Sequence, residues 1–201
     1  MMRRLGIPLL VAPLLCALAA SPANAKEWAP DYDHSFLGFT GTQGETKFEG
    51  HFKKFEVHID FDTDKPETGK IAAKIAIASV TAGSDERDSA LPAPEWFDAA
   101  QFPEAQFLST DIKAAACGQA TPPGLTNVTC YKAAGTLTVK GISKPITLDF
   151  LLGKEGDHMR AQAKAKLLRT DFGVGLGPWA DETYVKRAVD LTIDIVARQA
   201  S

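Results

Sequence analysis

Alternation of apolar and polar residues is the feature that most constrains how this 201-residue chain can fold. In residues 55–61, FEVHIDF, every odd position is apolar and every even position is polar. A period of two places apolar side chains on one face of a strand and polar side chains on the other. The same pattern recurs in five further segments: 71–77, 136–140, 146–150, 160–167 and 189–195.

Stretches rich in turn-forming residues separate these segments, at 62–69, 140–141 and 153–156. Connections this short join antiparallel neighbours. Two shorter candidate strands, 36–42 and 106–113, bring the expected number of strands to eight.

Residues 84–101 do not alternate. Ser84 or Asp85 can cap a short helix that ends before Pro92, and residues 95–100 fit another turn or two of helix. The chain is therefore predicted to be all-β, with a short helical segment between the third and fourth strands.

Eight strands with one apolar face each must hide those faces from water. A two-sheet sandwich does so by stacking, and a closed barrel does so by turning them inward, which also removes exposed edges. Alanines occupy several of the inward positions, at Ala73, Ala161, Ala163 and Ala165. Small inward residues leave space along an axis, whereas a sandwich core fills its space. This pattern favours an eight-stranded antiparallel barrel over the sandwich.

The first 25 residues have the pattern of a cleavable secretory signal. Arg3 and Arg4 precede an uncharged apolar run, residues 5–20, and Ala23 and Ala25 occupy the positions that a signal peptidase reads. We expect cleavage after Ala25, which leaves residues 26–201 as one domain outside the cytoplasm, in the periplasm.

Two alternatives to cleavage fit the amino-terminal segment less well. A membrane anchor needs about 20 apolar residues, and Pro13 and Pro22 interrupt a run that is already shorter. A lipoprotein anchor at Cys16 would require small residues where Leu14 and Leu15 stand.

The net charge of the chain limits the partners that it can bind by electrostatic attraction. Of the 22 Lys and Arg residues, two lie in the signal segment, so residues 26–201 carry 20 basic against 25 acidic residues, a net charge of −5. Nucleic acid requires a basic surface, and anionic lipid requires a polybasic patch. We therefore do not expect the protein to bind nucleic acid or anionic lipid through electrostatic attraction.

Two cysteines, Cys117 and Cys130, remain after processing. In an oxidising compartment an isolated pair forms a disulfide more often than a metal site. The residues between them are rich in glycine and proline, so we expect a structural bridge that fastens this loop.

Catalytic and metal-binding patterns are weak. His51 and His58 have opposite parity along a strand, and His34 and His158 have no partner at ligand spacing. No serine lies in a nucleophile-elbow context. The glycines of residues 173–177 lack the lysine and the strand–loop–helix setting of a phosphate loop. We therefore assign no catalytic residue, no metal ligand and no enzymatic activity.

Two arginines stand out against the apolar pattern. Arg87 lies beside the predicted helix, and Arg169 follows the inward parity of Leu167. Because a buried arginine is costly unless it is paired, Arg169 is expected to form an ion pair, for instance with Asp88 or Asp171. The alternative is that either arginine donates to the head group of a bound ligand.

The order and spacing of several motifs resemble the YceI-like, polyisoprenoid-binding periplasmic proteins. The resemblance extends from Trp28 to about Ala197, and its motifs are Trp28, Asp33-His34-Ser35, Gly50-His51-Phe52, Ile59-Asp60-Phe61-Asp62, Arg87-Asp88, Leu91, Trp96-Phe97-Asp98, Phe102-Pro103, Phe107-Leu108-Ser109, residues 135–141, residues 144–148 and residues 169–173. The segment 117–130 departs from the common pattern between the fourth and fifth strands.

The resemblance implies a lipocalin-like barrel whose lumen carries a long polyisoprenoid lipid, such as an isoprenoid quinone, as a ligand. Transient contact with a membrane or with a quinone-using membrane protein, and a homodimer, are further expectations. The alternatives are a quinone- or lipid-processing enzyme and a stress-related partner-binding module with a filled core. Parity predicts ten lumen walls: Phe55, Val57, Ile75, Ile77, Phe107, Leu137, Leu148, Phe150, Leu167 and Ile193.

Overall fold

Long antiparallel strands form most of the structure, a computed structural model that describes residues 26–118 and 120–200. The predicted signal peptide, residues 1–25, lies outside the described residues. The strands are β1 (Glu27–Gln43), β2 (Thr46–Phe52), β3 (Phe55–Asp60), β4 (Lys70–Ala76), β5 (Val80–Thr81), β6 (Glu104–Ala115), β7 (Thr126–Val139), β8 (Ile142–Glu155), β9 (His158–Leu168) and β10 (Ala188–Gln199).

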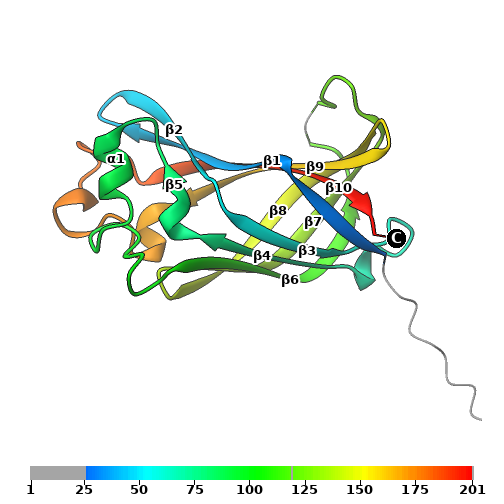
Figure 1. Ribbon diagram of the computed structural model, residues 1–201, viewed down its shortest axis with the longest axis horizontal. Coiled ribbons are helices and arrows are strands. Elements are labelled where there is room, and N and C mark those ends of the chain that lie inside the picture. The colour runs from blue at the N-terminus through cyan, green and yellow to red at the C-terminus, as the bar shows by residue number, and fades with distance from the viewer. Residues whose placement is uncertain (1–25, 119, 201) are drawn as a thin grey trace, which may run out of the picture.

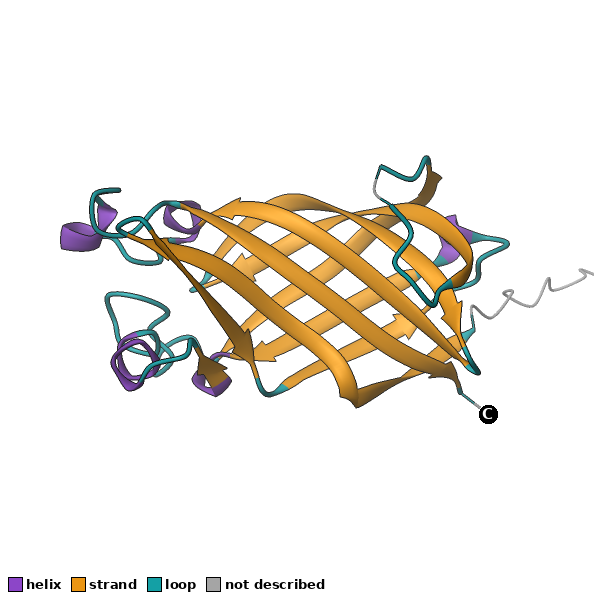
Figure 2. Cartoon of the chain, turned by 90° about the horizontal axis from the view of Figure 1, so that it is seen from above, coloured by secondary structure: helices purple, strands orange, loops and turns teal. Residues whose placement is uncertain are grey.

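Eight of these strands close into a barrel (Figures 1 and 2). Their order is β10-β9-β8-β7-β6-β4-β3-β1, and β10 pairs with β1 to complete the circle. The closing ladder is antiparallel and places Leu37 opposite Ile193 and Phe39 opposite Leu191. The predicted eight-stranded antiparallel barrel is confirmed, and the sandwich alternative is wrong because no open edge separates two sheets of the barrel strands.

Strand β2 pairs with residues 38–43 of β1, on the same side of β1 that meets β3 at residues 27–28, and β5 pairs with β2. Because Phe48 and Phe52 of β2 line the interior, β2 continues the wall where β3 leaves β1. Strand β2 lies outside the predicted strand segments, although Phe48, Gly50 and Phe52 alternate with polar residues. Gly50 interrupts that apolar pattern because the ring of Phe39 fills the space where a Cβ would stand.

Several barrel strands are longer than their alternation suggested. The predicted segment 136–140 is the end of β7, which begins at Thr126, and the predicted 146–150 lies within β8, which runs to Glu155. Ala133, Ala134 and Gly135 interrupt the alternation in the middle of β7. Pairing with β6 and β8 on both sides fixes the strand in spite of its weak local preference.

The described helices are short. Helix α1 (Asp85–Ala90) lies between β4 and β6, the third and fourth barrel strands, as predicted, and the Ser84 hydroxyl accepts a hydrogen bond from the Arg87 amide at 3.3 Å. Four 3-10 helices accompany it: η1 (Pro66–Thr68), η2 (Ile77–Ser79), η3 (Arg169–Phe172) and η4 (Gly177–Ala180). None of the helices in this described part of the chain is long and apolar enough to span a membrane.

The two ends of the barrel differ. Helix α1, η3 and η4 gather at one end, on the left in Figure 1, which we call the mouth end. The start of β1, the end of β10 and the loop between β6 and β7 lie at the opposite end.

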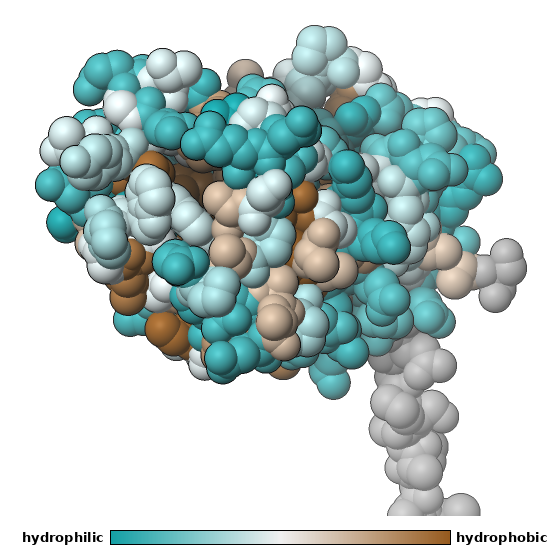
Figure 3. Space-filling view, turned by 60° about the vertical axis from the view of Figure 1, so that its left-hand side comes forward, coloured by the Kyte–Doolittle hydropathy of each residue, from teal (hydrophilic) through white to brown (hydrophobic). Residues whose placement is uncertain are grey.

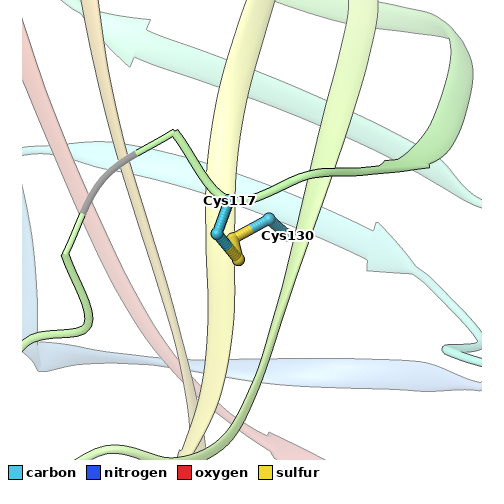
Figure 4. The surroundings of a disulfide bond; sticks show 2 residues. All are labelled: Cys117 and Cys130. Carbon is cyan, nitrogen blue, oxygen red and sulfur yellow. A yellow bond between two sulfur atoms is a disulfide. The ribbon is translucent and has the colours of Figure 1, made fainter.

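The predicted disulfide is present and joins Cys117 to Cys130 (Figure 4). The two Cα atoms are 5.1 Å apart, and Cys130 is buried in β7 beside Leu125 and Leu151. The bridge fastens the β6–β7 loop at the end of the barrel opposite the mouth end.

Removing this bridge should destabilise the fold. For a loop of this length the chain-entropy model gives about 3 kcal/mol, so the double variant Cys117→Ala/Cys130→Ala should lose about that much unfolding free energy in urea. The unsubstituted protein in excess dithiothreitol should unfold at the same urea concentration as the variant. Equal midpoints for the oxidised protein and the variant would show that the bridge does not constrain the chain.

Candidate functional site

An apolar cavity of about 280 Å³ occupies the interior of the barrel. Side chains from all eight barrel strands line it, and nearly all of them are aliphatic or aromatic. Figure 3, in which the mouth end comes forward, shows apolar side chains in a recess bordered by polar residues. Because an apolar cavity of this kind gives water few hydrogen-bond partners, it favours an apolar occupant over water.

The cavity runs along most of the barrel. Met159 and Leu167, eight residues apart on β9, both line it. For tilted strands this separation corresponds to about 20 Å along the axis. Val189 and Ala197 on β10 bracket the same length. The shape is that of a tunnel suited to a long, slim group.

Aromatic side chains close the end opposite the mouth. The ring of Tyr131 stacks on Phe150 with centroids 5.3 Å apart, and Phe61 meets Tyr131 edge-on at 5.0 Å. Trp28 packs against this cluster, and its indole Nε1 donates to the Phe61 carbonyl at 2.9 Å. We call these four residues the aromatic plug.

The small side chains of alanine keep the tunnel open between the plug and the mouth. Ala73, Ala133, Ala161 and Ala163 line the wall where larger residues would meet across the axis. All ten apolar residues predicted as walls also line this cavity: Phe55, Val57, Ile75, Ile77, Phe107, Leu137, Leu148, Phe150, Leu167 and Ile193. Their contact with a ligand stays a prediction.

Arg169 lies at the mouth end of the cavity and is only 6% exposed. A guanidinium has five N–H donors, and all five are used by backbone carbonyls. Nε donates to Lys186 at 3.1 Å, and the two Nη atoms donate to four more carbonyls, those of Val174, Gly175, Trp179 and Val185. The guanidinium carbon also lies 5.5 Å from the centre of the Trp96 ring.

This arrangement corrects the expectation of an ion pair. Among the described residues no carboxylate lies within ion-pair distance of Arg169. Asp171 is exposed, and Asp88 instead accepts from the Thr81 hydroxyl and the Ala82 amide, which lower the pKa of its carboxyl. Burial lowers the pKa of Arg169, although a guanidinium remains charged at neutral pH. The carbonyl dipoles replace the expected carboxylate, and no donor is left over for a ligand head group.

The glycine-rich segment 173–177 wraps around Arg169. Gly175 has a positive φ of 64°, and a Cβ there would collide with the guanidinium and with the Trp96 ring. The Gly175 amide donates to the Glu95 backbone carbonyl at 2.9 Å, and the Lys140 ammonium donates to the Pro94 carbonyl at 2.7 Å. Arg169 and these bonds hold the loops of the mouth end in one place.

Arg87 lies outside the cavity. Its guanidinium stacks over the Phe48 ring at 5.0 Å, and Nε donates to the Ala82 carbonyl at 2.8 Å. Phe48 itself lines the cavity, so one aromatic ring separates Arg87 from the lumen. The structure therefore does not bring the two predicted head-group arginines together.

Sequence reasoning missed lining residues that come from loops and from β2. Phe52, Phe97 and Phe172 line the mouth end, as does Lys186. Its ammonium lies 3.9 Å from Glu45, whose side chain is 96% exposed. The alternation in β2 was a usable signal for Phe52. The other positions depend on how the loops fold back over the barrel.

Within residues 26–118 and 120–200, no three His, Cys, Asp or Glu side chains gather as a metal site would require. His51 instead packs beside the Phe36 ring, with centroids 5.7 Å apart. The chemistry that this interior offers is burial of apolar surface.

The chain is similar to known proteins over most of its length. The family model described as the YceI-like domain matches residues 28–197. A UPF0312 protein of Photorhabdus laumondii is 33% identical over 180 residues, which cover 85% of this chain and 87% of that protein. A UPF0312 protein of Pseudomonas putida is 30% identical over 187 residues, with 89% of each chain covered.

Solved structures share the fold. BcnA of Burkholderia cenocepacia matches with a TM-score of 0.74 at 27% identity, over 84% of this chain and 99% of that chain. A YCEI protein of Campylobacter jejuni matches with a TM-score of 0.59 at 25% identity, over 76% and 85%. A polyisoprenoid binding domain from Saccharophagus degradans has a TM-score of 0.64 at 14% identity, over 88% and 99%, a likeness of fold alone.

Substituting Arg169 should destabilise the mouth end. Arg169→Lys leaves at most three donors for five carbonyls, and unsatisfied buried groups should lower the unfolding free energy by about 3 kcal/mol in urea denaturation. The matched control is Arg187→Lys, because Arg187 is exposed and its Nε makes only a long hydrogen bond, 3.4 Å, to the Ala180 carbonyl. That control should change stability by less than about 0.5 kcal/mol. Equal effects of the two substitutions would contradict the role given to Arg169.

Proposed function

This chain belongs to the YceI-like domain family, and from that premise we propose that its barrel binds and carries a polyisoprenoid lipid. The observation that carries the proposal is the long apolar cavity, which has an aromatic plug at one end and a recess bordered by polar residues at the mouth end. The fold shared with the polyisoprenoid binding domain of Saccharophagus degradans is in keeping with it.

The energetics of such binding follow from the lining. Burial of apolar surface contributes about 25 cal/mol per Å², so a long tail gains affinity along its whole length without polar contacts. A polyisoprenoid also needs a dry compartment of its own length to move through water. The tunnel supplies this compartment, and the small residues Ala73 and Ala163 supply its width.

The lining sets the orientation of the lipid. The aromatic plug offers no free polar group, so the end of the tail lies toward Trp28. The head lies at the mouth end, where Lys186 is a lining residue whose ammonium lies 3.9 Å from the exposed Glu45 carboxylate. An isoprenoid quinone fits this arrangement, because its ring carries carbonyl oxygens that accept hydrogen bonds.

The location in this proposal comes from the amino-terminal sequence. The signal pattern of residues 1–25 supports a periplasmic protein, and the disulfide suits that oxidising compartment. A periplasmic carrier exchanges its lipid with a membrane or with a quinone-using membrane protein. A homodimer is a further possibility within the proposal.

The cavity bears on the two alternatives as well. A stress-related partner-binding module with a filled core does not account for a tunnel of this length. A quinone- or lipid-processing enzyme would need reactive groups at the mouth, and the Arg169 donors there are committed to carbonyls. These observations favour a carrier over an enzyme.

Native mass spectrometry tests the proposal directly. Protein secreted to the periplasm of a bacterial host and purified without detergent should carry an extra mass, and organic extraction should release a species with an isoprenoid fragmentation series. A bare protein mass, with no uptake of added ubiquinone or polyprenol, would exclude the carrier.

Filling the tunnel should weaken binding. Ala73→Phe places a ring in the lumen, and overpacking of this kind costs about 1–3 kcal/mol, so affinity for a ubiquinone should fall about tenfold or more. The control is Ala72→Phe on the same strand, because Ala72 pairs with Leu108 on the outer face. Tryptophan fluorescence quenching by the quinone gives both affinities. Equal losses in the two variants would place the ligand outside the barrel.

A further inference from the structure

The ladder between β1 and β3 is the weakest join in the barrel wall. It consists of two residue pairs, Glu27 with Asp60 and Trp28 with Ile59. Every other neighbouring pair of barrel strands shares at least five pairs. Beyond Trp28 the two strands separate (Figure 1), and the pairing on this side of β1 resumes at Gly38, opposite His51 of β2. We call this interval, between residues 30–36 and residues 55–57, the seam.

Pro30 explains why the ladder stops. The Lys26 carbonyl accepts from Phe61 beside β3, and the Glu27 carbonyl accepts from Ala200 beside β10. Successive residues of a strand turn their backbone N–H and C=O groups to opposite sides of the strand. The N–H and C=O groups of the even-numbered residues at the start of β1 therefore point toward β3. Pro30 is the next even residue after Trp28, and it has no N–H to donate.

A bulge and one tyrosine close the seam. The β1–β10 register shifts between Asp31 and Phe36, and Ser35 fastens this bulge to β10, because its hydroxyl accepts from the Val196 amide at 3.0 Å. On the other side, the Val57 amide of β3 donates to the Tyr32 hydroxyl at 3.1 Å. The bulge is therefore anchored to β10 by the Ser35 hydroxyl and by the β1–β10 pairing on either side of it. It is joined to β3 by the Tyr32 side chain.

The seam has the cavity on its inner side and solvent on its outer side. Phe55, Val57 and Leu37 line the cavity. Tyr32 and Phe36, on the outside, are 46% and 43% exposed, and the Tyr32 ring meets Phe55 edge-on with centroids 5.6 Å apart. Side chains rather than a hydrogen-bonded ladder separate the lumen from water here.

We propose that the seam is a lateral port through which the lipid tail enters and leaves the cavity, with Tyr32 as its latch. This inference rests on the proposed function. A long tail that used the mouth alone would have to thread its whole length past loops that Arg169 holds in place. Opening the seam breaks the Tyr32–Val57 hydrogen bond instead of a ladder, and it lets the tail move sideways.

Two substitutions of opposite effect test the port. Tyr32→Phe removes the latch hydroxyl and keeps the ring, and Pro30→Val supplies the missing donor toward β3. Tyr184→Phe is the control, because Tyr184 is 59% exposed and lies away from the seam near the mouth end. The probe is a ubiquinone with a four-isoprene tail, which quenches the tryptophans that line the cavity, and stopped-flow mixing gives its association and dissociation rates.

The Tyr32→Phe variant should raise both rates about threefold or more while the dissociation constant stays within about twofold, because one hydrogen bond of ordinary strength changes an opening equilibrium about fivefold. Pro30→Val should slow both rates, and Tyr184→Phe should leave them unchanged. Unaltered rates in Tyr32→Phe would overturn the port.

Amide exchange of the lipid-free protein separates the port from the proposed function. Exchange of the Val57 amide should accelerate about fivefold in Tyr32→Phe, while that of Phe107 in β6 should not change. Unchanged exchange at Val57 would overturn the latch. If the unsubstituted protein does not bind the quinone, the proposed function falls and the port with it. Faster exchange with unchanged quinone rates would overturn the port alone.

Discussion

Pairing of β10 with β1 is the constraint on which the rest of this structure depends. Each barrel strand has one apolar face, and a sheet left open would need a second layer to cover it. Closure lets the sheet cover itself, so no other layer is required and the interior need not be filled. With Leu37 set opposite Ile193 in that ladder, both strands turn the same parity inward. The cavity is a direct result of this closure.

Much of the interior could be predicted from the sequence, because parity in a strand is a local property. Once residues 55–61 and 189–195 were identified as strands, their odd positions had to face the same way. That reasoning located the walls at Val57 and Ile193 without knowledge of the strand order. Alanine at positions 73, 161 and 163 pointed to an interior with space. The disulfide followed from compartment and count alone.

The mouth end could not be predicted in the same way, because its contacts join segments that are distant in the sequence. The charge on Arg169 suggested a carboxylate partner, yet five carbonyls from residues 174–186 take that place. Every residue has a backbone carbonyl, so the residue types of a sequence do not indicate which carbonyls will accept hydrogen bonds from a buried arginine. Likewise, Pro30 in β1 was not recognised as the end of a ladder, because its effect depends on which side of the strand faces β3.

An unfilled interior makes the empty protein less stable than a protein with a packed core, and a ligand that fills the interior adds stability. Well-packed cores gain dispersion energy across contacts that an open tunnel lacks along its axis. A lipid in the tunnel would supply those contacts, and any ligand that binds only the folded chain raises its stability in proportion to the logarithm of its free concentration. A bound lipid would then act as the missing part of the hydrophobic core. Lipid supply would set how long each copy survives proteolysis, so the quantity of carrier would follow the quantity of lipid without a separate regulator.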